Sequence, residues 1–385
     1  MSGAAVAPTP GPFHDLAPAA WAQVRENHRR FIAEKDFGRP LIFGLKSGAP
    51  AAISVADVSL AGPRERDPAA DAAIHASLRQ IGLLANGWGR PDSFPALVIP
   101  RRLYGHSQRL AEPFGGEPLV DGDHHCQCWP ALSDMSQIKH LRPKPLAACR
   151  YLARSLDLVR YCYESTEGRY PIRQMVTTGP IDTANYVTGS TLALAGMYEH
   201  PRELHALLRM VTDLLIEHIL ACRRLAGGNL VPDHTPLLSG YTLCSELRSE
   251  YSAAHYAEFE APYLKQIGDA VGPLIIHASG RWEQSLAGTL ADRNIIHLVL
   301  WARDTDLAVA TRTVGDRISL EAWQSDLPAK GFPSVADFYR YFFARLRPET
   351  RFTLAWVHPA EYNQVYDECE RAGTLPPQVR RYGRL

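Results

Sequence analysis

Short apolar segments alternate with amphipathic helical segments along most of the chain, and this alternation limits the possible folds more than any other feature. Each apolar segment is too short for a core helix, and several are rich in β-branched residues, so we interpret them as strands. The candidate strands are residues 39–45, 94–100, 172–178, 273–279, 294–301, 316–323 and 351–358.

The segments between the strands have helical periodicity, and residues 201–220 are the clearest example. Pro201 stands near the start, where a missing backbone N–H is tolerated. Apolar side chains then recur at the i, i+3, i+4 and i+7 spacing of one helix face, at Leu204, Leu207, Leu208, Val211, Leu215 and Ile219. Strands that are apolar along their whole length and separated by helices indicate a parallel sheet covered by helices.

About eight such strand–helix units predict an α/β fold, a closed (β/α)8 or TIM barrel with an N-terminal extension. A doubly wound open sheet is the alternative, but no Gly-x-Gly-x-x-Gly motif follows the first strand. We expect residues 1–20 to form a flexible arm and residues 21–385 to form one domain. In a TIM barrel the chemistry takes place at the C-terminal ends of the strands, so polar residues there are the first candidates.

Charge and composition limit the partners. Lys plus Arg equals Asp plus Glu, at 41 each in 385 residues. This balance creates no net field that would attract nucleic acid or an anionic membrane. The first twenty residues lack the basic start of a secretory signal, and no apolar run approaches the roughly 20 residues of a membrane span. We therefore expect a cytoplasmic protein that acts on a small molecule.

Several stretches follow one another in the order of a known family. The stretch TTGPIDTANYVTGS (177–190) is followed by the helical segment 197–219, by SAAHYAEFEAPYLKQI (252–267) and by HASG (277–280), and then by residues 331–346 and 353–365. Together they resemble the uroporphyrinogen decarboxylase superfamily, which also includes cobalamin-dependent methyltransferases. The resemblance covers residues 20 to 375 and implies the same barrel fold.

The departures from the family pattern bear on the substrate. Decarboxylases follow the first strand with an Arg-Gln-Ala-Gly-Arg loop, where this chain has Lys46 within Leu45-Lys46-Ser47-Gly48-Ala49. Arg101 and Arg102 stand where decarboxylases carry an aspartate. Without the arginine loop, a role in haem biosynthesis is not expected. Because cationic side chains pair with carboxylates and phosphates, we expect Lys46, Arg101 and the small polar Ser279 to contact the substrate.

The resemblance also implies a metal site with altered ligands. Methyltransferase relatives bind zinc through His-x-Cys and a second cysteine. Here His277 is retained, Ser279 replaces the first cysteine, and His358 lies at or next to the second. A serine hydroxyl is a poor zinc ligand because it lacks the charge of a thiolate. Glu246, at a further strand end, completes an expected site of His277, His358 and Glu246 for zinc, with iron as the second choice.

The expected catalytic residues are Tyr186, His277 and His358, where Tyr186 keeps its family spacing from the Gly-Pro pair. Each also has a structural interpretation. Glu246 could pair with Arg248 or Arg281, and a strand-end histidine is often only hydrogen-bonded. The tyrosine could pack its ring and donate its hydroxyl to a backbone carbonyl.

Three functions are compatible with the sequence. The first is methyl transfer or demethylation of a small methylated substrate, dependent on a metal and implying a corrinoid protein as partner. The second is a metal-free decarboxylase or lyase of a small carboxylic acid, in which Arg101 or Lys46 holds the acid and the histidines donate a proton. The third is a non-catalytic barrel subunit that docks to a corrinoid protein or pairs with itself as a homodimer.

Overall fold

The structure is a computed structural model that describes residues 41–42, 67–83, 96–121, 125–233, 240–302, 304–323, 332–354 and 358–384. The arm expected over residues 1–20, and Lys46, lie outside the described residues.

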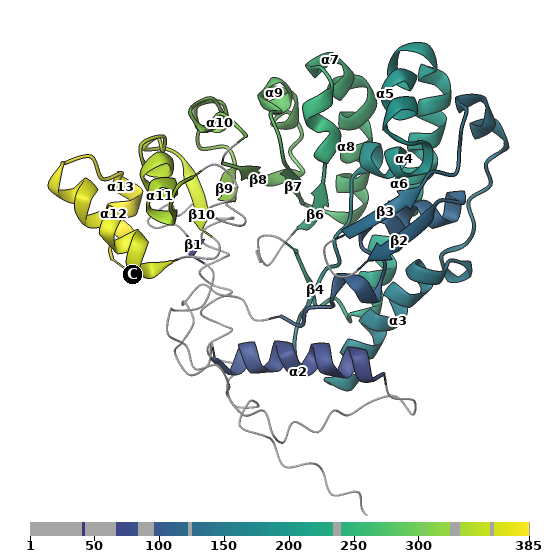
Figure 1. The fold of residues 1–385 in the computed structure, drawn as a ribbon, viewed down its shortest axis with the longest axis horizontal. Coiled ribbons are helices and arrows are strands. Elements are labelled where there is room, and N and C mark those ends of the chain that lie inside the picture. The colour runs from purple at the N-terminus through teal and green to yellow at the C-terminus, as the bar shows by residue number, and fades with distance from the viewer. Residues whose placement is uncertain are drawn as a thin grey trace, which may run out of the picture.

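A six-stranded sheet forms the centre of the fold, and every pair of neighbouring strands in it is parallel. The strands form an arc, visible in Figure 1. Their order in the sheet is β1 (Leu41–Ile42), β10 (Arg351–Leu354), β9 (Ser319–Trp323), β8 (Ile295–Trp301), β7 (Leu274–Ala278) and β6 (Tyr241–Cys244).

Isolated bridges continue this arc beyond β6. Thr178 bridges Cys244, and Leu97 bridges Ile172, both in parallel orientation. Between these bridges, β4 (Ile172–Arg173) pairs in parallel with β5 (Leu230–Val231). All seven strands predicted from the sequence therefore contain a strand or a bridge. Among the described residues no pairing joins β1 to the segment at Leu97, so the structure shows a parallel α/β arc without a closed ring.

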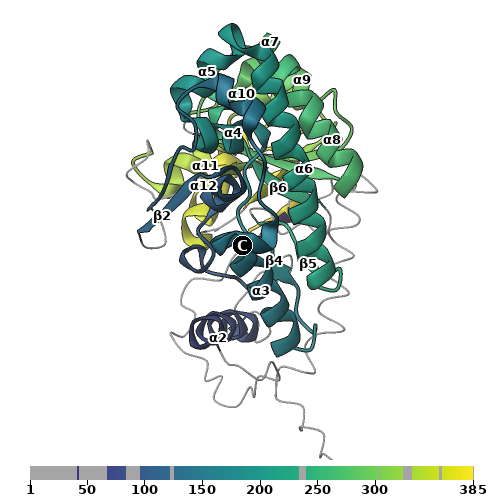
Figure 2. The same ribbon diagram turned by 90° about the vertical axis from the view of Figure 1, so that its right-hand side faces the viewer.

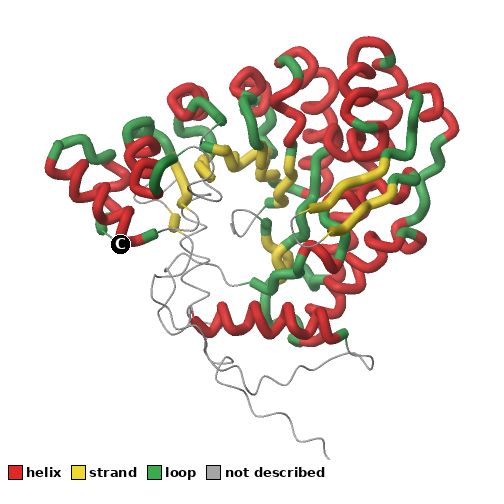
Figure 3. The backbone as a smooth tube through the Cα atoms, in the orientation of Figure 1, coloured by secondary structure: helices red, strands yellow, loops and turns green. Residues whose placement is uncertain are grey.

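Helices cover the outer side of the arc, as Figure 3 shows by secondary structure and Figure 2 from a second direction. The helix predicted over residues 201–220 is confirmed as α6 (Pro201–Leu225), with a proline in its first turn. The other helices are α2 (Pro68–Leu83), α3 (Arg150–Ser165), α4 (Pro180–Thr188), α5 (Ser190–Glu199), α7 (Ala253–His255), α8 (Ala261–Val271), α9 (Leu286–Thr289), α10 (Leu307–Val314), α11 (Val335–Phe343), α12 (Pro359–Arg371) and α13 (Pro377–Tyr382).

An antiparallel hairpin, β2 (Glu117–Asp121) with β3 (His125–Trp129), stands outside the sheet. Among the helices that the structure describes, none combines the length and the apolar composition that crossing a membrane requires.

The strands have two different faces. Leu243, Ile276 and Leu298 belong to the main core cluster, which they share with the covering helices. Because successive side chains alternate across a strand, Cys244 and His277 face the opposite side, the inside of the arc. Burial of each core aliphatic side chain stabilises the fold by about 1.5–3 kcal/mol. The outward face thus supplies stability, and the inward face is left for polar groups.

Candidate functional site

The C-terminal ends of β6 and β7 bring three metal-binding residue types together. Cys244 and His277 are register partners on these adjacent parallel strands. Glu246 follows two residues after the end of β6. The Cys244 sulfur, a Glu246 carboxylate oxygen and a His277 ring nitrogen all lie within 4.8 Å of one another. We call these three residues the β6–β7 cluster.

His277 is 4% exposed, and contacts at both ring nitrogens fix its tautomer. The indole N–H of Trp301, the last residue of β8, donates to Nε2 at 3.2 Å. Because Nε2 accepts this bond, the ring proton lies on Nδ1, which faces Glu246 Oε1 at 3.1 Å. The imidazole is thus held between a donor on one side and a carboxylate on the other.

Glu246 is ionised in this setting. Burial raises the pKa of its carboxyl, but the hydrogen bond and electrostatic attraction of His277 outweigh burial and hold the pKa below its usual value. The backbone N–H of Ser279 also donates to Glu246 Oε2 at 3.1 Å. Ser279, expected to contact substrate, therefore supports Glu246 through its main chain.

The surroundings of Cys244 are those in which a bound cation is favourable. Burial raises the pKa of its thiol well above the ordinary value, and the negative charges of Glu246, Asp233 and Asp182 raise it further. A divalent cation would offset these charges and favour the thiolate. Thiolate, imidazole and carboxylate are together a donor set that zinc accepts. The cluster therefore fits zinc, provided that His277 gives up one of its two ring contacts.

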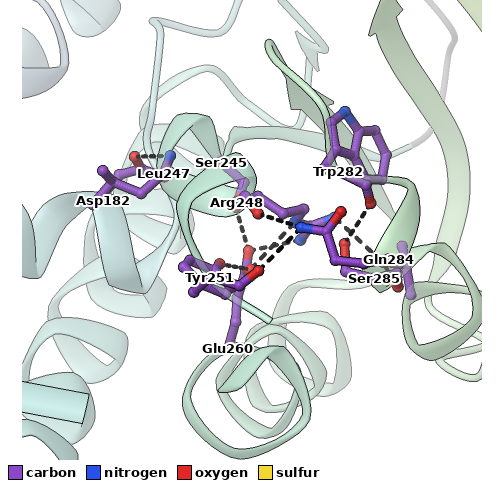
Figure 4. A network of polar contacts seen from close by, with 10 residues as sticks. Asp182, Ser245, Leu247, Arg248, Tyr251, Glu260, Trp282, Gln284 and Ser285 are labelled. Atoms are coloured by element: carbon purple, nitrogen blue, oxygen red, sulfur yellow. Dashed lines mark hydrogen bonds and ion pairs between the residues drawn. The ribbon is translucent and has the colours of Figure 1, made fainter. Parts of the chain in front are cut away.

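A buried ion pair anchors loop 245–251, which carries Glu246 and contains the 3-10 turn Glu246–Glu250 (Figure 4). Arg248 donates to Glu260 through Nη2 at 2.6 Å and through Nε at 3.2 Å, and the two side chains are 0% and 1% exposed. The hydroxyls of Ser245 and Tyr251 also donate to Glu260. Because the carboxylate is saturated with donors, the ion pair forms a rigid support beneath the loop.

Two further contacts hold the same loop from its sides. Asp182 on α4 accepts the backbone N–H of Leu247 at 3.0 Å. The side chain of Gln284 donates to the backbone carbonyls of Arg248 at 3.1 Å and Tyr251 at 3.0 Å. Figure 4 shows both contacts around the ion pair. Together with Glu260, the residues Asp182 and Gln284 therefore fix the conformation of loop 245–251.

A π-helical turn places Glu260 under this loop. The short helix α7 continues into the turn Tyr256–Glu260, and α8 follows directly. A π-turn accommodates one extra residue in a helix and occurs often at functional sites. The matching sequence segment, 252–267, is one that resembles the family. Its structural contribution is to direct a carboxylate toward Arg248.

Gly280 explains why the strand containing His277 ends in small residues. Its φ of +79° lies in the left-handed region, and a Cβ at this position would stand 2.8 Å from the Cβ of Ser249. Only glycine allows both this backbone conformation and this close approach. The turn after β7 thereby packs directly against loop 245–251.

Tyr186 takes part in a chain of polar contacts on the α4 side. Its hydroxyl lies 3.2 Å from Ser107 Oγ, which lies 2.8 Å from His106 Nδ1. Burial lowers the pKa of His106 to about 3, with the charges of Arg101 and Arg109 adding to the effect. Burial also raises the pKa of Tyr186, and the charges of nearby acidic groups and Cys244 contribute. The phenol therefore stays protonated and can act as a donor.

The remaining expected site residues lie in different places. Arg101, in the 3-10 turn Arg101–Leu103, lines a cavity of about 380 Å³. His358 is exposed at the N-cap of α12, and its backbone N–H donates to the Tyr339 hydroxyl at 3.2 Å. In the described part of the chain its ring is not among the ligand atoms grouped with Glu246 and His277. Its role as a ligand stays a prediction.

Cys244 was not among the candidate site residues that the sequence predicted. A signal was present. The expectation that Glu246 follows a strand end also places the residues just before it on that strand, and Cys244 is the last residue of β6. The salt bridge considered for Glu246 is instead made by Glu260, the partner of Arg248.

Comparisons with known proteins give a consistent result. The family model described as "Uroporphyrinogen decarboxylase (URO-D)" matches residues 128–320. Among solved structures, the chain resembles a methyltransferase from Methanosarcina mazei. That likeness has a TM-score of 0.57 and 14% sequence identity, and it covers 74% of this chain and 78% of the other. At this identity the likeness concerns the fold. No curated protein matches the chain.

Proposed function

Because the chain belongs to the uroporphyrinogen decarboxylase family, we propose that it is a methyltransferase-type enzyme of that family which uses a metal at the β6–β7 cluster. The observation that carries the proposal is the convergence of Cys244, Glu246 and His277 within 4.8 Å at adjacent strand ends. The fold of the methyltransferase from Methanosarcina mazei supports the same reaction class. We further propose that β1 and the segment at Leu97 close the arc into a barrel, with residues 21–385 as one domain.

The side chains would divide the work as follows. Cys244, Glu246 and His277 would hold a zinc ion, which supplies Lewis acidity toward a bound substrate atom when present. Glu246 keeps its charge, and Ser279 orients it through the backbone. Tyr186, protonated and held by Ser107, orients the substrate or donates a proton to it. Arg101 contributes positive charge to the neighbouring cavity.

A corrinoid protein as methyl donor or acceptor is part of the proposal, as is self-association into a homodimer. The corrinoid would supply the carrier of the methyl group, as the resemblance to cobalamin-dependent methyltransferases implies.

Zinc analysis tests the metal. We expect close to one zinc per chain by elemental mass spectrometry after dialysis, and loss of most of it in Cys244→Ser, Glu246→Gln and His277→Gln. Cys369→Ser, a partly exposed cysteine on α12, is the matched control. Cobalt-loaded protein should show thiolate-to-cobalt absorption that disappears in Cys244→Ser and persists in Cys369→Ser. Full zinc retention in all three cluster variants would contradict the proposed site.

Methylcobalamin, used in place of a corrinoid protein, tests the reaction. Loss of its cobalt–methyl absorbance in the presence of a panel of small nucleophiles is the expected signal, and it should depend on His277. If the protein binds zinc but does not demethylate methylcobalamin, the proposed metal site is supported and the proposed methyl transfer is refuted.

One observation favours the metal-free decarboxylase or lyase as a second candidate. Trp301 engages Nε2 of His277 and Glu246 faces Nδ1, so both ring nitrogens have protein partners without a metal. Release of carbon dioxide from a small carboxylic acid by zinc-free protein would support this candidate over the first. The open cavity beside the strand ends gives no support to a non-catalytic subunit with a closed barrel mouth.

A further inference from the structure

The cavity lined by Arg101 has an unusual concentration of positive charge. Arg101 and Arg102 follow the strand segment at Leu97, and Arg173 belongs to β4. Asp233, two residues after β5, is the one carboxylate among the described residues that line it. Among the described lining residues, the guanidinium groups of Arg101 and Arg173 therefore outnumber the single carboxylate.

Neighbouring strands bring these charges together and hold them in place. Leu97 bridges Ile172, and Ile172 pairs in turn with Leu230. Gln174, the residue after Arg173, fixes the wall toward β6. Its side-chain amide donates to the carbonyl of Thr242 at 2.7 Å and accepts the N–H of Thr242 at 2.9 Å. The arginines thus project from a backbone that is rigid before any ligand binds.

One of the arginines has unused hydrogen-bonding capacity. Arg173 Nε is buried and has no hydrogen-bond partner in the part of the chain that the structure describes. A buried N–H without a partner is unfavourable, and a bound anion would satisfy it. Burial raises the pKa of the Asp233 carboxyl, and the charges of Arg173 and Arg101 act in the opposite direction.

The backbone connects the cavity to the β6–β7 cluster. Gln174, in the cavity lining, bonds to Thr242 of β6, two residues before Cys244. Thr178, four residues after Gln174, bridges Cys244 directly. A ligand held by the arginines would therefore extend toward Cys244 and His277.

The volume and walls limit the ligand to a small molecule. About 380 Å³ is near the lower end of the range for small-molecule sites. Ile99 and Val176 form apolar parts of the lining, suited to a short carbon chain between charged ends.

We propose that this cavity binds a small dicarboxylate, with Arg101 and Arg173 pairing with its carboxylates and the carbon chain lying against Ile99 and Val176. The inference deepens the proposed function, and it depends on that function only for the claim that the bound acid is the substrate.

Calorimetric titration of the full-length protein with succinate tests the proposal, with succinamide and inorganic phosphate as comparison ligands. We expect succinate to bind and succinamide not to bind, with phosphate at least several-fold weaker than succinate. Because a charge-assisted pair is strong, Arg101→Gln and Arg173→Gln should each weaken succinate roughly tenfold or more. Arg142→Gln, an exposed arginine outside the cavity, should have no effect.

Asp233→Asn gives a result of opposite sign, which a merely structural role would not produce. Removal of the opposing carboxylate should tighten succinate binding by about threefold or more. Absence of succinate binding, equal binding of succinamide, tighter binding of phosphate, or weaker succinate binding in Asp233→Asn would each overturn the proposal. Zinc titration of Arg173→Gln separates the two proposals. A variant that has lost succinate binding but binds zinc with unchanged affinity shows that the proposed metal site does not depend on the proposed dicarboxylate site.

Discussion

Trp301 donates its indole N–H to Nε2 of His277 at 3.2 Å, so one tryptophan at the end of β8 occupies the lone pair that a metal at this nitrogen would need. A metal bound at Nε2 would therefore compete with Trp301 for the same atom, whereas a metal bound at Nδ1 would not. The outcome of that competition decides whether the cluster acts as a metal site or as an acid–base group.

Trp301→Phe should tighten zinc binding. A hydrogen bond of this kind contributes about 0.5–1.5 kcal/mol, so its loss should lower the zinc dissociation constant by roughly twofold to tenfold. Competition with a chromophoric chelator measures the change. Trp129→Phe, at a tryptophan that is 62% exposed, is the control and should leave the affinity unchanged. Weaker zinc binding in Trp301→Phe would mean that the indole supports the site and does not compete with it.

Glu260→Gln should destabilise the fold strongly. The substitution leaves the guanidinium of Arg248 buried without its counter-charge, which costs about 3–5 kcal/mol in comparable buried pairs. Urea denaturation followed by circular dichroism measures the loss. Asp157→Asn, which removes one partner of the exposed pair with Arg160, should change stability little. A loss no larger than that of the control would show that the ion pair does not support loop 245–251.

Gly280→Ala should destabilise the protein and weaken zinc binding together. Alanine at φ +79° is strained by about 1–2 kcal/mol, and its Cβ would also press against Ser249. Gly373→Ala isolates the backbone effect, because Gly373 has φ +70° with nothing within 4 Å of its Cβ position. We expect a larger loss of stability at position 280 than at position 373, with reduced zinc affinity at position 280 alone. Equal losses would remove the contact with Ser249 from the explanation.

Stability should fall on acidification below about pH 6.5. Burial lowers the pKa of His297 from 6.5 to about 3, and it also lowers the pKa of His218. The unfolded chain then binds protons that the folded chain does not, so stability is complete above pH 6.5 and declines toward pH 3. Each histidine contributes on the order of 1 kcal/mol per pH unit in that window.

His218→Gln tests this assignment. The amide can still reach Ser155, which lies 3.1 Å from Nε2 of His218, but it does not titrate. We expect a shallower decline in the free energy of unfolding between pH 6.5 and 4.5 than in the unchanged protein. His140→Gln, at an exposed histidine, should keep the original slope. An unchanged slope in His218→Gln would assign the acid sensitivity to other groups.

The sequence predicted the strands well where they are long and apolar. Segments such as 273–279 and 294–301 carry an unbroken hydrophobic pattern, because both faces of a parallel sheet are covered. The two-residue strand β5 has no such pattern and was missed. α6 extends five residues beyond the predicted end, up to the pair Gly227-Gly228, whose helix-ending signal the apolar periodicity alone did not include.

The candidate site was predictable only in part. The strand-end positions of Glu246 and His277 followed from family spacing, and the structure places them in contact. The contact of Trp301 with His277 joins residues 24 apart on different strands, and no local pattern encodes it. Arg173 looked like an ordinary strand residue. Its place beside Arg101 depends on which strands become neighbours, which is a property of the assembled sheet.

The π-turn Tyr256–Glu260 makes one stretch of the chain intolerant of length changes. Deleting one residue from the π-turn would convert it to regular α-helix. The chain that precedes the turn, including α7, would then be rotated by about 100° relative to α8. Glu260 would then lose its alignment with Arg248, although no amino acid near the metal ligands had been replaced. Proteins that share this arrangement should accumulate insertions and deletions in their outer loops and keep the spacing between residues 252 and 263 constant.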